Sequence, residues 1–234
     1  MTTALILAGG LDIRFQLNIP KQFVNVDNRP LIIYTLEQFQ QSSDVDEIIV
    51  MCLEGWQEMV RVYAKQFNLS KVNTILEGGK NVQESTYLGL QYIKKNAKPG
   101  DIVIIHDAIR PLVTEDIISK SIQMCRKKGM GVAATPILDT IIHSANQHEG
   151  YHSIKRDEIM KVQTPQTFDL EYLWKMHEKA LAEGRTGAWD NCSMLTELGE
   201  KVIFSEGSDL NLRINTTEDV EMFQALYKKF QNKD

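Results

Sequence analysis

The fold is decided by a short apolar run that ends in two glycines, Ala4-Leu5-Ile6-Leu7-Ala8-Gly9-Gly10. Similar apolar runs extend from Ile48 to Cys52, from Val72 to Leu76 and from Ile102 to Ile105. Near-continuous runs of this length are typical of strands that are buried on both faces of a sheet. They therefore predict a sheet that is covered on both sides.

Segments with the spacing of an amphipathic helix lie between and after these strands. They are Leu31 to Phe39, Val82 to Ile93, Ile118 to Cys125, Leu170 to Leu181 and Thr216 to Phe230. Thr216 and Asp219 have the spacing of a capping box, which predicts where the last helix begins. Strands that alternate with helices predict an α/β fold with a mostly parallel, helix-covered sheet.

The alternation breaks between about Leu138 and Thr164. Residues 139–143 have the pattern of a strand, residues 144–150 are polar and turn-like, and residues 151–154 could form a returning strand. We interpret this region as a β-hairpin arm that leaves the sheet. The alternative is a surface excursion without a partner.

The length and composition are those of a compact globular protein. The 234 residues carry 26 basic and 31 acidic side chains, a net charge of −5. This acidic balance argues against a protein whose main partner is a nucleic-acid backbone. No apolar run approaches the roughly 20 residues of a membrane-spanning helix, so no membrane partner is expected.

The N-terminus lacks the basic segment of a secretory signal, and the three cysteines are scattered along the chain. Neither a disulfide framework nor a metal cluster is expected from these cysteines. Because no repeat or linker is present, we predict a single domain over residues 1–234 with an arm at about 138–163. We expect the protein to be cytoplasmic.

The turn after the first strand has the composition of a phosphate-binding loop. Gly9 and Gly10 would let backbone N–H groups approach an anion closely, and Arg14 and Lys21 follow on the same loop. This combination suits a nucleoside triphosphate that reacts at phosphorus. Neither the Walker pattern nor the GxGxxG pattern is present. The alternative is a flexible turn with two solvated cations.

A second candidate group follows the strand that begins at Ile102. Asp107 falls at the carboxyl end of this strand, where open α/β sheets bind their ligands, and Arg110 comes three residues later. A single carboxylate there can hold Mg²⁺, which takes other ligands from nucleotide phosphates, and the arginine could bind an anionic substrate. A surface ion pair is the alternative for these two residues. His106 is interpreted as a structural residue.

Weaker signals lie elsewhere in the chain. Gly78-Gly79 ends the strand that begins at Val72, and Ser85 follows in the next helix. This arrangement suits the binding of a nucleotide base or ribose. An ordinary turn followed by a helix cap is the alternative. The remaining signals are Asp139-Thr140, Arg156, Gln163-Thr164-Pro165-Gln166 and Asn211-Leu212-Arg213.

In their order along the chain, these motifs closely resemble those of the cytidylyltransferases that activate sugar-alcohol phosphates. This is the family of 4-diphosphocytidyl-2-C-methylerythritol synthase and ribitol-5-phosphate cytidylyltransferase. The residues that carry the resemblance are Ala8-Gly9-Gly10, Arg14, Pro20-Lys21-Gln22, Gly78-Gly79, Ser85, His106-Asp107-Ala108, Arg110-Pro111, Asp139-Thr140, Arg156, Thr164-Pro165-Gln166, Asn211 and Arg213. The match extends over essentially the full length.

The resemblance implies a Rossmann-like α/β fold and the reaction CTP + polyol phosphate → CDP-polyol + pyrophosphate, with Mg²⁺. The nucleotide-binding residues would be Ala8, Gly9, Gly10, Gly79, Ser85, Asp107 and Ala108, and Asp107 would also bind the metal. The catalytic residues would be Arg14, Lys21 and Arg213. The polyol phosphate would be bound by Arg110, Thr140, Arg156 and Thr164.

The resemblance also implies a homodimer, because in such families the arm interlocks with that of a second subunit. Thr140 and Arg156 of one chain would then reach the site of the other chain. The nucleophile is an already ionised phosphate, so no catalytic base is required. Catalysis would consist of positioning and charge stabilisation.

Three positions depart from the family pattern: Asp12 replaces a usual glycine, Val82 a usual arginine and Arg213 a usual lysine. Together with residues 141–144 of the arm, they favour ribitol 5-phosphate as the acceptor, for cell-surface polymers. The alternatives are the methylerythritol phosphate enzyme of isoprenoid synthesis, a non-catalytic nucleotide-binding paralogue, and a related nucleotidyltransferase that uses another base or a sugar 1-phosphate.

Overall fold

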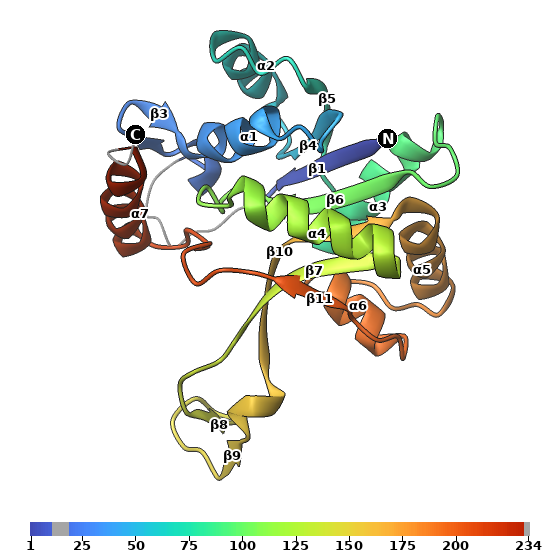
Figure 1. Cartoon of the computed structure of the whole chain (residues 1–234), viewed down its shortest axis with the longest axis vertical. Helices are drawn as coiled ribbons and strands as arrows, with labels where there is room; N and C mark the ends of the chain where they lie inside the picture. The colour runs from blue at the N-terminus through green and yellow to red at the C-terminus, as the bar shows by residue number, and fades with distance from the viewer. Residues whose placement is uncertain (11–18, 232–234) are drawn as a thin grey trace.

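The computed structural model describes residues 1–10 and 19–231 (Figure 1). Its main sheet has seven strands in the order β11-β7-β10-β6-β1-β4-β5. These strands are β1 (Thr2–Ala8), β4 (Glu47–Cys52), β5 (Val72–Glu77), β6 (Ile102–Asp107), β7 (Met130–Pro136), β10 (Met160–Asp169) and β11 (Phe204–Glu206). The helices are α1 (Leu31–Gln41), α2 (Gln57–Gln66), α3 (Val82–Lys94), α4 (Glu115–Lys128), α5 (Leu170–Ala182), α6 (Asn191–Glu197) and α7 (Thr217–Gln231).

The sheet is mostly parallel. Strand β1 pairs in parallel with β4 and with β6, and parallel pairs also join β4 to β5 and β7 to β11. Strand β10 runs antiparallel to both of its neighbours, β6 and β7. The predicted α/β fold with a mostly parallel sheet is confirmed.

The core lies on both faces of the sheet, because successive residues of a strand point to opposite faces. In β1, Ala4 and Ile6 pack in a cluster with α1, α2 and α4. Leu5 packs in a second cluster with α3, α5 and α6. A third cluster packs Phe223 of α7 against Leu31. Because both faces of β1 are buried, its sequence does not alternate between apolar and polar residues.

Strand β5 is an exception to the burial that the sequence pattern predicts. The run from Val72 to Leu76 is only half-buried, with Asn73 exposed, so the interpretation that it is buried on both faces is wrong. The physical reason is its place at the edge of the sheet, where β4 is its neighbour on one side.

Capping side chains mark the starts of two helices. At the start of α7, the Thr216 hydroxyl accepts from the Asp219 N–H at 3.2 Å, and the Asp219 carboxylate accepts from the Thr216 N–H at 2.9 Å. These reciprocal bonds confirm the predicted capping box. Thr114 caps α4 by accepting from the N–H of Ile117.

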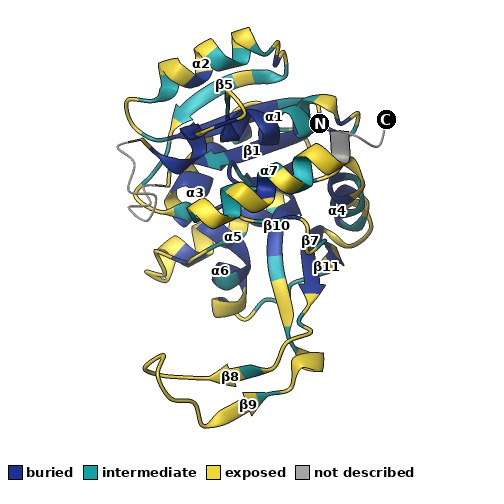
Figure 2. Cartoon of the chain, turned by 90° about the vertical axis from the view of Figure 1, so that its left-hand side faces the viewer, coloured by how far each residue is buried: buried dark blue, intermediate teal, exposed yellow. Residues whose placement is uncertain are grey.

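The arm is a small antiparallel hairpin, β8 (Ile141–His143) and β9 (His152–Ile154), which stands away from the main sheet (Figures 1 and 2). The predicted protruding hairpin is confirmed, although its first strand begins at Ile141 and not at residue 139. Figure 2 shows that the arm is almost wholly exposed, in contrast to the sheet.

Among the described residues, none of the helices has the length and apolar character that crossing a membrane requires.

Candidate active site

The strand order places a crevice beside β1. From β1 the chain goes first to β4 and β5 on one side and then to β6 on the other. In open α/β sheets, ligands bind beyond the carboxyl ends of the strands where the order reverses in this way. The carboxyl ends of β1, β5 and β6 carry Gly9-Gly10, Gly78-Gly79 and Asp107, so the three motifs meet at one edge of the sheet.

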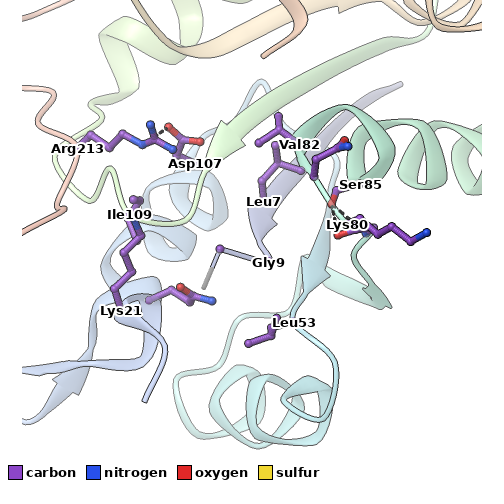
Figure 3. A pocket seen from close by; sticks show the side chains of 14 residues that line it. Leu7, Gly9, Lys21, Leu53, Lys80, Val82, Ser85, Asp107, Ile109 and Arg213 are labelled. Carbon is purple, nitrogen blue, oxygen red and sulfur yellow. Dashed lines mark hydrogen bonds and ion pairs between the residues drawn. The ribbon is translucent and has the colours of Figure 1, made fainter. Parts of the chain in front are cut away.

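A pocket of about 410 Å³ lies at this edge (Figure 3). Its lining residues are Leu7, Gly9, Gly10, Lys21, Gln22, Leu53, Gly79, Lys80, Asn81, Val82, Ser85, Asp107, Ile109 and Arg213. Figure 3 shows Gly9 between Asp107 and Arg213 on one side and Ser85 on the other. The structure thus gathers predicted residues from five separate segments of the chain in one pocket.

Asp107 forms the charged centre of one wall of this pocket. Its Oδ2 lies 3.1 Å from Nε of Arg110 and 3.3 Å from Nε of Arg213. Burial alone would raise the pKa of Asp107, but the guanidinium groups of Arg213 and Arg110 outweigh burial and hold the pKa below its usual range. Asp107 is therefore a carboxylate at neutral pH.

Arg110 and Thr164 connect Asp107 to the rest of the fold. Arg110 donates from Nη1 to the carbonyl oxygen of Asn211 at 2.8 Å. Thr164 accepts from the Asp107 N–H at 3.1 Å, and its own carbonyl accepts from Asn211 at 2.8 Å. Two of the four predicted acceptor-binding residues, Arg110 and Thr164, thus contact Asp107 directly.

Lys21 contributes a buried cationic side chain to the same side of the pocket as Asp107 and Arg213 (Figure 3). Its side chain is 6% exposed, and Nζ donates to Oδ1 of Asn215 at 2.9 Å. The neighbouring Gln22 donates to the carbonyl oxygen of Ala8 at 2.6 Å, which holds this segment against the end of β1. A cation that is held in place beside this pocket is suited to stabilise charge on a bound anion.

The turn after β5 requires glycine for space. A Cβ on Gly79 would lie 2.4 Å from Cγ of Glu84, so any other residue here would force the Glu84 side chain to move. The Gly79 N–H donates to the hydroxyl of Ser85 at 2.9 Å, so this serine fixes the turn that borders the pocket.

The other predicted residues have different positions. Arg14 and Asp12 lie outside the described residues. Ala8 and Ala108 are buried, and Ala108 uses its N–H and carbonyl in bonds within the fold. Thr140 and Arg156 are exposed on the arm, away from the pocket of their own chain. Arg156 donates there to the carbonyl of Leu138 at 2.7 Å. The roles of all these residues stay predictions.

Some pocket residues were not singled out from the sequence. Lys80 and Asn81 line the pocket, and the position of Lys80 directly after Gly78-Gly79 is a signal that could have identified it. Asn215 gave no such signal, because its contact with Lys21 joins residues 194 positions apart.

The donor set at Asp107 fits a divalent cation that is bound mainly through phosphates. Among the described residues, no three His, Cys, Asp or Glu side chains gather as they would around a metal held by protein alone. Mg²⁺ in nucleotide sites needs only one or two carboxylates, with phosphate oxygens and waters as further ligands. The ionised Asp107 supplies such a carboxylate.

His106 is buried behind the site and is expected to make folding sensitive to acid. Its ring packs 4.9 Å from that of Phe39, and burial lowers its pKa from 6.5 to about 3. Below pH 6.5, His106 therefore binds a proton in the unfolded chain but not in the folded chain. The contribution of His106 to the free energy of unfolding is therefore complete above pH 6.5 and falls by about 1.4 kcal/mol per pH unit between pH 6.5 and 3.

Urea unfolding at pH 7.5, 6.5 and 5.5 measures this effect. In His106→Gln the loss of stability between pH 6.5 and 5.5 should be about 1 kcal/mol smaller than in the wild type. The exposed His143→Gln on the arm is the matched control and should keep the wild-type dependence. Equal pH dependence in all three proteins would contradict a neutral buried His106.

Fold and site together define an α/β enzyme of the nucleotidyltransferase class, with cations, two glycine turns and a carboxylate around one pocket. The family described as "IspD: 2-C-methyl-D-erythritol 4-phosphate cytidylyltransferase" matches residues 2–229, and the chain belongs to this family of cytidylyltransferases.

Individual relatives agree with this membership. The chain is 35% identical to ribitol-5-phosphate cytidylyltransferase of Lacticaseibacillus paracasei, covering 98% of this chain and 99% of that protein. It is 33% identical to 2-C-methyl-D-erythritol 4-phosphate cytidylyltransferase of Clostridium novyi, covering 97% of each. The crystal structure of the Francisella tularensis 2-C-methyl-D-erythritol 4-phosphate cytidylyltransferase matches with a TM-score of 0.80, at 26% identity over 95% of this chain and 99% of that one. The resemblance inferred from the motifs is confirmed.

Proposed function

We propose that this cytidylyltransferase converts CTP and ribitol 5-phosphate into CDP-ribitol and pyrophosphate. The observation that carries this choice of acceptor is the 35% identity, over nearly the whole of both chains, to a ribitol-5-phosphate cytidylyltransferase. The methylerythritol phosphate relatives at 33% identity keep that acceptor as the second candidate.

In the proposed reaction, a phosphate oxygen of the polyol phosphate attacks the α-phosphorus of CTP in line, and the bond to pyrophosphate breaks. The attacking oxygen is already ionised, so no side chain has to remove a proton. Lys21 and Arg213 line the pocket in which negative charge develops, and we assign them its stabilisation. Arg14 is assigned the same role from the family pattern.

The nucleotide is proposed to lie along the glycine turns. The N–H groups after β1 can approach a triphosphate closely, because Gly9 and Gly10 carry no side chain. Gly79 and Ser85 border the place proposed for the cytidine. Arg110 and Thr164, behind Asp107, are assigned to the acceptor phosphate.

Asp107 is the residue proposed to hold Mg²⁺. When bound, this cation supplies positive charge to the phosphate oxygens of the nucleotide. The contacts of Arg110 and Arg213 fix the orientation of the carboxylate before any ligand binds.

The arm is proposed to form a homodimer in which each chain completes the site of the other. Exposed apolar side chains support this proposal: Leu138 is 72% exposed and Tyr151 82%. Thr140 and Arg156 would then contact the polyol phosphate in the second chain.

A cytoplasmic location is also proposed, because the three cysteines are free thiols.

A panel of acceptors tests the proposed function. Pyrophosphate release is followed with CTP, Mg²⁺ and, in turn, ribitol 5-phosphate, methylerythritol 4-phosphate and glycerol 3-phosphate. We expect kcat/KM for ribitol 5-phosphate to exceed that for methylerythritol 4-phosphate at least about 10-fold, a difference of about 1.4 kcal/mol in transition-state binding. UTP, GTP and ATP in place of CTP test the choice of base.

Other outcomes select the alternatives. Preference for methylerythritol 4-phosphate would assign the chain to isoprenoid synthesis. If no acceptor gives pyrophosphate release but calorimetry detects CTP binding, the chain is the non-catalytic paralogue.

A further inference from the structure

The segment of residues 211–215, between β11 and α7, has side chains whose surroundings alternate. Ile214 belongs to the third core cluster, and Leu212 packs against that cluster. The other three side chains contact residues of the active site: Asn211, Arg213 and Asn215. Because every second residue packs in the core, the segment holds the remaining three at fixed places beside the site.

Asn211 is the buried first residue of this segment, with an exposed fraction of 1%. Its Nδ2 donates to the carbonyl oxygen of Thr164 at 2.8 Å. Its own carbonyl oxygen accepts from Nη1 of Arg110 at 2.8 Å. One asparagine therefore contacts both Arg110 and Thr164, the two residues assigned above to the acceptor phosphate.

The contact with Asn211 restricts the guanidinium group of Arg110. Arg110 donates from Nε to Oδ2 of Asp107 at 3.1 Å and from Nη1 to the carbonyl oxygen of Asn211. Because the guanidinium group is planar, two donors on two separate anchors fix the plane in which its remaining N–H groups lie. A fixed fork of this kind is suited to a phosphate group.

The same asparagine supports Thr164 where the sheet gives it little support. The pairing of β10 with β7 shifts register between Val162 and Gln166, and Thr164 lies within this shift. The bond from Asn211 to the Thr164 carbonyl oxygen supplies a contact from outside the sheet. It thereby holds the residue whose hydroxyl accepts from the N–H of Asp107.

Gln163 fastens the chain just before Asn211 to the same part of β10. Its Nε2 donates to the carbonyl oxygen of Ser208 at 2.8 Å, and its Oε1 accepts from the N–H of Ser208 at 3.3 Å. The same Oε1 accepts from Nδ2 of Asn211 at 3.4 Å. Two buried side-chain amides thus join this loop to the strand that carries Thr164.

We propose that Asn211 is a positioning residue for the acceptor, because it holds Arg110 and Thr164 in the arrangement that receives the phosphate of the polyol phosphate. This inference rests on the proposed function, since it concerns the binding of the second substrate. Binding residues that are held in place before the substrate arrives need no further ordering when it binds. Loss of the Asn211 amide therefore weakens the binding of the acceptor.

Steady-state kinetics of Asn211→Ala test this proposal. We expect the KM for ribitol 5-phosphate to rise about 10-fold. The KM for CTP should stay within about 2-fold of the wild-type value, because Asp107 keeps its contact with Arg213. An unchanged acceptor KM, or an equal rise in both KM values, overturns the proposal and leaves the proposed function intact.

The matched control is Asn191→Ala. Asn191 is 2% exposed and donates from Nδ2 to Oε1 of Gln166 at 3.3 Å, so it is an equally buried amide with a different partner. This variant should lower the free energy of unfolding and leave the ratio of the two KM values unchanged. If it raises the acceptor KM as selectively as Asn211→Ala does, the effect comes from lost packing and the proposal is overturned.

A double variant gives a readout that a merely structural role would not change. In a Thr164→Ala background the hydroxyl is already lost, so Asn211→Ala can act only through Arg110. The rise in acceptor KM should then shrink from about 10-fold to about 3-fold. A rise of the same size in both backgrounds overturns the proposal, which requires both residues.

Two precautions keep these measurements decisive. Urea unfolding is measured for each variant, and if Asn211→Ala does not fold, Asn211→Ser takes its place, since its hydroxyl is too short to reach the Thr164 carbonyl oxygen. If methylerythritol 4-phosphate proves to be the acceptor, the proposed function fails. The same comparison of KM values with that acceptor then still decides the role of Asn211.

Discussion

Replacing Lys21 with methionine is expected to lower kcat by at least about 100-fold, a loss near 3 kcal/mol of transition-state stabilisation. The substitution keeps a long apolar stem at a site that is 6% exposed, so the packing should survive while the charge disappears. The loss should fall on kcat more than on the KM for CTP, because charge on the phosphates increases as the reaction proceeds. Pyrophosphate release at saturating substrates measures this effect.

Two further variants sharpen this result. Lys127→Met removes an exposed ammonium from the end of α4 and should leave kcat unchanged. Asn215→Ala removes the side chain that accepts from Lys21 at 2.9 Å and should have an intermediate effect, since the ammonium itself remains. A near-normal rate in Lys21→Met would remove Lys21 from the catalytic residues.

Replacing Asp107 with asparagine is expected to have the larger effect, a loss of about 1,000-fold in kcat, or about 4 kcal/mol. The amide keeps the size of the side chain but loses the negative charge that suits a divalent cation. The Mg²⁺ concentration needed for half-maximal rate should rise as well. Titration of Mg²⁺ at fixed CTP measures both changes.

The same substitution should also lower stability. Arg110, whose side chain is 12% exposed, would lose its ion-pair partner, and we expect the free energy of unfolding to fall by about 2 kcal/mol. The matched control is Asp116→Asn, which removes an exposed carboxylate from α4. If Asp107→Asn keeps more than a tenth of the rate and an unchanged Mg²⁺ requirement, Asp107 does not hold the metal.

Elements with a strong local signal could be predicted from the sequence. Strands β1, β4 and β6 are apolar on both faces, and the caps at Thr114 and Thr216 mark the starts of α4 and α7. Such signals depend on neighbours within a few residues, so they can be read without knowing the fold. The hairpin nature of the arm could be predicted for the same reason.

Other elements had no such signal. Strand β7 contains Gly131 and the small Ala133 and Ala134, and β10 contains Pro165, all of which weaken a strand pattern. These two strands form because they pair with each other and β10 also pairs with β6, with a shift of register between Val162 and Gln166. Helix α6 has only 7 residues, too few to establish a helical period.

By itself, the sequence determined the α/β class, the arm and the family, because periodicity and the order of short motifs are properties of the chain alone. The tertiary structure decided which groups share the site. Placing β1 between β4 and β6 brings both glycine turns to Asp107, and contacts over a hundred residues or more, such as Lys21 with Asn215 and Arg110 with Asn211, complete the arrangement. Such contacts depend on strand order and packing, which no local pattern specifies.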